Sequence, residues 1–140
     1  MNVAKIMIPK IFTKFLRENN TVRQGLEMFK QHGYTAVPVL GENGRYIGCV
    51  TEGDFLRHIM DVGSTNLKDH EKYLISDIIR KDFSPALNID DDYETVLSSV
   101  LNQNFVPIVD DRGALCGILT RKIIIDFLSG KDKNVLETNS

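Results

Sequence analysis

The chain contains an internal repeat, and this repeat restricts the possible folds more than any other feature of the sequence. Val37-Pro38-Val39-Leu40 returns as Val106-Pro107-Ile108-Val109, at an offset of 69 residues. Gly48-x-x-Thr51 returns at the same offset as Gly117-x-x-Thr120. We therefore expect two copies of one small unit.

Both copies show the same order of secondary structure signals. Val22, Leu26 and Phe29 have helical spacing, with Thr21 as a candidate N-cap and Gly33 as the C-terminal stop. The first copy predicts a helix at 21–32, a strand at 34–40, a turn at 41–44, a strand at 46–50 and a helix at 52–62. The second predicts a helix at 92–102, a strand at 105–109, a turn at 110–113, a strand at 114–119 and a helix at 121–129.

A short lead-in precedes each copy. Residues 3–9 and 74–81 are expected to be helical, and residues 11–16 and 83–89 to be extended. The resulting domain prediction is a first repeat at 3–62, a linker at 63–72, a second repeat at 73–129 and a flexible tail at 130–140.

The fold class follows from this order. Each copy is an α+β unit of the type β-α-β-β-α with one apolar sheet face, and it is too small to bury a sufficient core alone. We expect the two units to pack sheet to sheet with pseudo-twofold symmetry, which would leave two clefts between the repeats for small ligands.

Composition excludes several functional classes. Hydrophobic residues make up 42% of the chain, and no apolar run has the roughly 20 residues of a membrane helix. The N-terminus lacks the pattern of a signal peptide, so a cytoplasmic protein is expected. A net charge of −2 argues against nucleic acid binding. The three histidines show no ligand spacing, and no nucleophile–base pair is evident, so neither a metal site, a cofactor nor an enzyme is predicted.

The repeated strings resemble a known family. Residues 33–39, Gly-Tyr-Thr-Ala-Val-Pro-Val, precede Gly48-x-x-Thr51-x-x-Asp54, and residues 105–110, Phe-Val-Pro-Ile-Val-Asp, precede Gly117-x-x-Thr120. Over residues 3–129 this order is similar to a tandem pair of CBS domains, called a Bateman module. The run at 33–38 and the second-repeat Thr-Arg-Lys resemble the stand-alone bacterial proteins that bind cyclic di-AMP.

This resemblance implies a regulatory module that binds an adenine nucleotide, AMP, ADP, ATP or cyclic di-AMP, in the inter-repeat clefts. It further implies a homodimer that regulates an unidentified partner protein. The implied ligand-binding residues are Phe12, Thr13, Tyr34, Thr35, Ala36, Val37, Pro38, Thr51, Asp54, Pro85, Ala86, Phe105, Val106, Pro107, Thr120, Arg121 and Lys122. The aromatic residues and the Val-Pro pairs in this set would wall the adenine, or they would simply belong to the core.

The strand-to-helix corner of the first repeat has two interpretations. Thr51 and Asp54 have the spacing of a capping box, in which each side chain bonds the backbone amide of the other residue. Alternatively, the Thr51 hydroxyl contacts a phosphate while Asp54 accepts hydrogen bonds from the two hydroxyls of a ribose.

The second corner differs in charge. Arg121 and Lys122 lie in the first turn of a helix, where a positive charge costs about 0.3 to 1 kcal/mol. No stabilising role for them is evident from the sequence, so either they bind a phosphate together with Thr120 or they are solvated charges. Ile123 stands where the first repeat has Asp54, so the two clefts should not be equivalent.

Two predictions remain about association. The apolar flanks of the last helix of each repeat are expected to form a homodimer interface through Phe55, Ile59, Ile124 and Phe127. The alternative function is a ligand-independent interaction module whose corners only cap helices.

Overall fold

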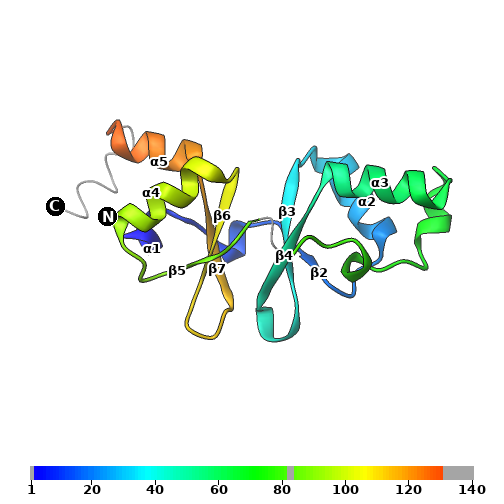
Figure 1. Cartoon of the computed structure of the whole chain (residues 1–140), viewed down its shortest axis with the longest axis horizontal. Helices are drawn as coiled ribbons and strands as arrows, with labels where there is room; N and C mark the ends of the chain where they lie inside the picture. Colours follow the sequence, from blue (N-terminus) through cyan, green and yellow to red (C-terminus); the bar gives the residue numbers. More distant parts are fainter. Residues whose placement is uncertain (1, 82–83, 131–140) are drawn as a thin grey trace. The chain divides into compact units, whose positions relative to one another are not determined.

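The computed structural model describes residues 2–81 and 84–130, which form two packing units. Residues 14–81 make up one of them, here called the central unit. Residues 2–13 and 84–130 together make up the other, here called the terminal unit. Figure 1 shows that each unit has its own sheet and its own pair of long helices.

The central unit contains a three-stranded sheet of order β2-β3-β4. Strand β2 is parallel to β3, and β3 and β4 form an antiparallel hairpin. The elements are β2 (Leu16–Arg17), α2 (Val22–His32), β3 (Ala36–Leu40), the 3-10 turn η2 (Glu42–Gly44), β4 (Tyr46–Thr51), α3 (Glu52–Val62) and the 3-10 turns η3 (Leu67–His70) and η4 (Ile75–Asp77). Its core consists of Leu16, Val22, Val37, Val39, Val50, Phe55 and Ile75.

The terminal unit contains a four-stranded sheet of order β1-β7-β6-β5. It repeats the parallel pair and the hairpin of the central unit and adds β1 at one edge. The elements are α1 (Val3–Ile6), β1 (Ile8–Pro9), the 3-10 turn η1 (Lys10–Phe12), β5 (Leu87–Asn88), α4 (Tyr93–Asn102), β6 (Phe105–Val109), β7 (Leu115–Thr120) and α5 (Arg121–Leu128). Its core consists of Val3, Ile6, Val96, Val100, Val106, Ile108, Leu119 and Ile124.

The predicted α+β units of type β-α-β-β-α are confirmed, and the boundaries of the long elements are close to those expected. Thr21 caps α2 in a full capping box with Gln24, and Gly33 ends the helix in the left-handed conformation at φ 66°. Asp92 caps α4 through the amide of Thr95. These signals are local in sequence, which is why the sequence predicted the helices well.

The lead-in segments differ from the prediction. Only residues 3–6 of the first lead-in are helical, and Lys10–Phe12 form a 3-10 turn instead of an extended piece. In the second lead-in, the expected helix at 74–81 is reduced to the 3-10 turn η4. Phe83 and residues 131–140 of the flexible tail expected at 130–140 lie outside the described residues.

The first part of each lead-in, residues 3–9 and 74–81, packs with the other repeat, whereas β2 and β5 pair with their own repeats. Strand β1 pairs antiparallel with β7, so Ile8 lies opposite Ile118. In the central unit the corresponding contact is a bridge in which Arg80 exchanges backbone hydrogen bonds with Cys49, at 2.9 and 3.0 Å. The repeats of the sequence and the units of the structure therefore differ by an exchange of the first parts of the lead-ins.

The repeated glycine makes this exchange possible. A Cβ on Gly48 would collide with the carbonyl oxygen of Arg80, and a Cβ on Gly117 would collide with the carbonyl oxygen of Ile8. Gly48 also has a φ of 152°, which L side chains rarely adopt. The glycine of Gly-x-x-Thr is thus required by the backbone that crosses it.

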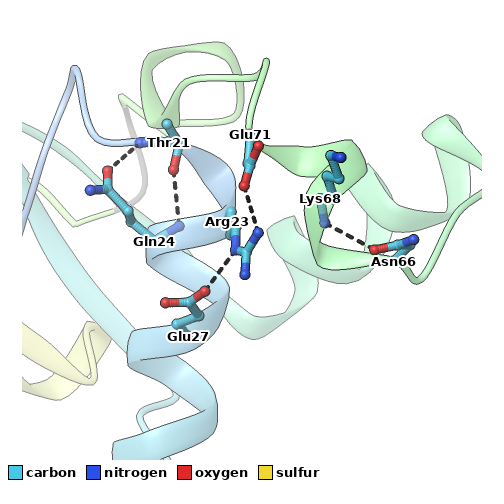
Figure 2. Close-up of polar contacts among 7 residues, drawn as sticks. All are labelled: Thr21, Arg23, Gln24, Glu27, Asn66, Lys68 and Glu71. Carbon is cyan, nitrogen blue, oxygen red and sulfur yellow. Dashed lines mark hydrogen bonds and ion pairs between the residues drawn. The ribbon is translucent and has the colours of Figure 1, made fainter.

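The predicted linker at 63–72 is tied to helix α2 within the central unit. Arg23 on α2 bridges Glu27 on the same helix, at 2.8 Å, and Glu71, at 2.5 Å (Figure 2). His70 is fully buried. This segment is therefore part of the central unit rather than a free connection.

Two of the four residues predicted for a dimer interface require correction. Phe55 and Ile124 are each only 3% exposed and belong to the two cores, because they face the sheets. The exposed apolar side chains on these helices are Leu56 and Met60 on α3, and Ile125 and Leu128 on α5. None of the helices within residues 2–81 and 84–130 has the length and apolar character needed to cross a membrane.

Candidate functional site

The corner between β4 and α3 is a complete capping box. The Thr51 hydroxyl accepts a hydrogen bond from the Asp54 amide at 3.2 Å, and Asp54 Oδ2 accepts one from the Thr51 amide at 2.9 Å. The same hydroxyl donates to Asp54 Oδ2 at 3.0 Å. Asp54 is 5% exposed, so its carboxylate is held rigidly at the start of the helix. The structural interpretation of this pair is confirmed.

Two arginines also bind Asp54, and the sequence analysis missed both. Arg80 Nε donates to Asp54 Oδ1 at 2.7 Å, and Arg57 Nη2 donates to the same oxygen. The Arg57 and Arg80 side chains are 57% and 40% exposed, whereas that of Asp54 is 4% exposed. Arg57 could have been found from its i, i+3 spacing to Asp54. Arg80 could not, because it reaches the corner through the exchanged lead-in.

This cluster has the chemistry of a nucleotide subsite. Guanidinium groups, a helix N-terminus and a hydroxyl are suited to a phosphate, and a carboxylate is suited to ribose hydroxyls. Both oxygens of Asp54 already accept hydrogen bonds within the protein. A ribose at Asp54 would therefore have to replace one of the protein donors.

The corner between β7 and α5 is capped by Thr120, whose hydroxyl accepts from the Ile123 amide at 3.2 Å. Arg121 points to the end of α4, where Nε donates to the Val100 carbonyl at 3.1 Å and Nη2 to the Leu101 carbonyl at 3.2 Å. The inference that no stabilising contact accounts for Arg121 is therefore wrong. Lys122 is exposed in the same turn.

The Val-Pro segments lie inside the two units. Val37 and Val106 belong to the cores, and Pro38 and Pro107 are buried beside them. Phe105 is 7% exposed. The core interpretation holds for Val37 and Val106, whereas Pro38, Phe105 and Pro107 alternate with core residues along β3 and β6 and point to the opposite face of their sheets.

Tyr34, Thr35 and Ala36 are more accessible. The Tyr34 ring packs edge-on against Phe29 at 6.3 Å between centroids and lies beside His32 at 5.4 Å. Thr35 is exposed, and its carbonyl accepts from the Glu52 amide at 3.0 Å. Ala36 is the register partner of Thr51, so this run lies next to the first corner.

The predicted lead-in residues all lie in the terminal unit. Phe12 is 76% exposed, whereas Thr13 is 6% exposed and its hydroxyl donates to the Pro9 carbonyl at 3.0 Å. The Pro85 carbonyl accepts from Gln103 Nε2 at 3.2 Å, and Ala86 is half-buried. Of these residues, Phe12 and Pro85 are exposed.

The predicted residues thus form two groups. The central unit holds Tyr34, Thr35, Ala36, Val37, Pro38, Thr51 and Asp54, and the terminal unit holds Phe12, Thr13, Pro85, Ala86, Phe105, Val106, Pro107, Thr120, Arg121 and Lys122. Within the described part of the chain, no three His, Cys, Asp or Glu side chains are placed to hold a metal ion.

Known proteins with similar sequences include a cyclic di-AMP receptor. The chain is 24% identical over 127 residues to cyclic di-AMP receptor B of Bacillus subtilis, covering 91% of this chain and 86% of the relative. It is 27% identical over 100 residues to an uncharacterised protein of Methanopyrus kandleri, covering 69% of this chain and 47% of the relative.

Solved structures share the fold. The crystal structure of CbpB in complex with c-di-AMP matches with a TM-score of 0.82 and 17% identity, over 99% of this chain and 88% of that chain. Listeria monocytogenes CbpB in complex with c-di-AMP matches with a TM-score of 0.79 and 20% identity, over 92% and 96% of the two chains. The family model of the CBS domain matches residues 3–61 and 75–130, and the chain therefore belongs to the CBS domain family.

Proposed function

We propose that this chain is a regulatory module that binds an adenine nucleotide, with cyclic di-AMP as the first candidate, and that it is not an enzyme. The observation that carries the proposal is the cluster of Thr51, Asp54, Arg57 and Arg80 at the start of α3. It combines a buried carboxylate with arginine side chains that reach solvent. The cyclic di-AMP receptor among the relatives supports the choice of nucleotide.

The corner between β7 and α5 would contribute to phosphate binding in a different way. Because Arg121 is bound to the α4 carbonyls, its phosphate contact would need the remaining N–H groups of the guanidinium or a rotation away from α4. Lys122 adds a second positive charge to this corner, and Thr120 adds a hydroxyl. Phe12 is the side chain most available to stack on a base, since it is exposed.

Calorimetric titration tests the proposal directly. Protein freed of co-purified small molecules is titrated with AMP, ADP, ATP and cyclic di-AMP, and we expect heat with at least one of them. Arg57→Ala should weaken that binding about tenfold, since a hydrogen bond to a charged group contributes about 1.5 to 3 kcal/mol. Absence of heat with all four nucleotides would contradict the proposal.

The alternative is a ligand-independent interaction module. It is favoured by one observation, namely that both corner threonines accept the amide hydrogen bonds of ordinary helix caps. Under this alternative the nucleotides produce no heat and no change in melting temperature.

The proposed module works as a homodimer in the cytoplasm and acts on a partner protein; these points remain predictions. The exposed side chains that would form the dimer interface are Leu56, Met60, Ile125 and Leu128. Light scattering at micromolar concentration tests this, because a monomer would contradict it.

A further inference from the structure

A polar cavity lies within the central unit, between α3 and the segment that follows it. Its volume is about 570 Å³, and its wall includes Arg57, His58 and Asp61 from α3 and Tyr73 and Asp77 from the following segment. All of these residues belong to residues 14–81, so the cavity is a property of one unit. It shares two wall residues, Asp54 and Arg57, with the cluster at the start of α3.

His58, like Asp54, is a buried polar side chain of this wall, and the tautomer of His58 follows from its neighbours. His70 Nε2 lies 2.8 Å from the Ser64 carbonyl, which can only accept, so His70 Nε2 carries a proton. In neutral His70, Nδ1 then accepts, and it lies 3.1 Å from His58 Nε2. His58 must therefore donate from Nε2, which leaves His58 Nδ1 with a lone pair.

This lone pair has no partner in the described part of the chain. His58 is 8% exposed, and its only hydrogen bond there is the one to His70. No buried side-chain nitrogen or oxygen of the described residues lacks a hydrogen bond, so His58 Nδ1 must be reached by solvent. His58 is otherwise buried and lines the cavity, so the cavity is the route by which solvent would reach Nδ1.

The charges around Nδ1 favour a cation. Asp61 and Asp77 both act on His58 through their negative charge, and within the described residues the Asp61 carboxylate has no hydrogen bond or ion pair. Asp77 uses Oδ2 to accept from the Leu74 amide at 2.9 Å. Arg57, the cation of the wall, is paired with Asp54, a carboxylate that it shares with Arg80. Burial, followed by the proximity of His70, lowers the pKa of His58, so the imidazole is neutral near neutral pH.

We propose that this cavity binds an organic cation with N–H donors, an alkylammonium or a guanidinium, between His58 Nδ1 and the carboxylates of Asp61 and Asp77. An N–H donor would satisfy the lone pair, and the positive charge would interact with the carboxylates. A metal ion fits less well, because no three metal-ligating side chains are grouped among the described residues. The site does not depend on nucleotide binding.

Two variants test this site, and a third serves as their control. His58→Gln keeps a donor near the Nε2 position for His70 but removes the Nδ1 acceptor. Asp61→Asn removes one charge with little change of shape. Asp90→Asn removes the same charge from an exposed position in the terminal unit and serves as the control.

The test is an NMR titration of the ¹⁵N-labelled full chain with agmatine, which carries both an ammonium and a guanidinium group. We expect saturable shifts centred on residues 57–62 and 73–78, with affinity lowered about tenfold by Asp61→Asn and by His58→Gln, since each removes a hydrogen bond to a charged group. Asp90→Asn should leave the affinity unchanged. A long-range ¹H–¹⁵N spectrum should also show neutral His58 protonated at Nε2.

Several outcomes would overturn the proposal. These are the absence of saturable shifts, shifts centred elsewhere, or an equal loss of affinity in Asp61→Asn and Asp90→Asn, which would indicate only general charge attraction. Acetate, an anion added as its sodium salt, should give no saturable shifts in this region. The nucleotide titration is an independent measurement, so failure of one proposal leaves the other standing.

Discussion

Arg121 Nε donates a hydrogen bond of 3.1 Å to the carbonyl of Val100, and this contact connects the start of α5 to the end of α4. The C-cap residue of α4, Gln103, has an extended conformation with φ −131°. Helix α2 instead ends at Gly33, whose amide donates to the Phe29 carbonyl at 2.8 Å. Arg121 thus satisfies carbonyls in the second repeat where a left-handed glycine does so in the first, and it places a positive charge at the negative end of α4.

Replacing Arg121 should therefore destabilise the protein. We expect Arg121→Ala to lower the free energy of unfolding by about 1 kcal/mol, the usual net contribution of an exposed or half-buried hydrogen bond. Lys122→Ala is the control, because Lys122 is exposed in the same turn, and it should have little effect. Urea unfolding followed by circular dichroism measures both. Equal stability of Arg121→Ala and the unaltered protein would show that the contact to α4 contributes nothing.

The sequence predicted the elements whose signals are local. Helix α3 begins and ends as expected, at Glu52 and Val62, because Thr51 and Gly63 define its ends within the helix's own sequence. Strand β6 likewise has the predicted bounds. A cap, a left-handed glycine or a run of buried strand residues acts on its immediate neighbours, and neighbours in sequence are visible before folding.

The sequence did not predict which segments would pair. The alignment of the copies placed the lead-in at 3–9 with the first repeat, yet β1 pairs with β7 of the second. The same exchange brings Arg80 to Asp54, 26 residues away. The His58–His70 pair was missed for another reason, because the segment holding His70 resembled a polar linker. Long-range partners depend on how the chain closes, which periodicity does not encode.

Gly48 should be among the positions least tolerant of substitution. In Gly48→Ala the new methyl group would collide with the Arg80 carbonyl, and the backbone at φ 152° would be strained. We expect a loss of about 3 kcal/mol in the free energy of unfolding. Thermal and urea unfolding would detect a loss of this size.

A matched control lies five residues further along. Gly53 is in the first turn of α3, and a methyl group added there would have its nearest heavy atom, Arg57 Nη1, at 3.6 Å. Gly53→Ala should be neutral or stabilising by up to about 1 kcal/mol, because alanine favours the helix. If both variants lost the same stability, close approach of the lead-in would not be the reason for Gly48.

Asp54 should contribute both to stability and to nucleotide binding. Asp54→Asn removes the charge that Arg57 and Arg80 share, and an amide cannot accept from all of the present donors. We expect a loss of about 1 to 2 kcal/mol in the free energy of unfolding, which is less than for a fully buried pair because both arginines are partly exposed. Asp61→Asn, on the same helix, should be near neutral. A stable Asp54→Asn variant would mean that the ion pairs are too well solvated to matter.

The buried histidine pair should make stability depend on pH. Burial and the neighbouring His70 lower the pKa of His58 in the folded protein, although Asp61 and Asp77 act in the opposite direction. The unfolded chain, with an ordinary His pKa of about 6.5, then binds more protons than the folded one. The stabilising contribution of neutral His58 is therefore fully present above about pH 6.5 and is lost as the pH falls toward the folded pKa.

Urea unfolding at a series of pH values tests this. The free energy of unfolding should decline at low pH, and His58→Gln should reduce that decline. His32→Gln, at an exposed position, should retain the decline, and an unchanged slope in His58→Gln would assign the pH dependence to other groups.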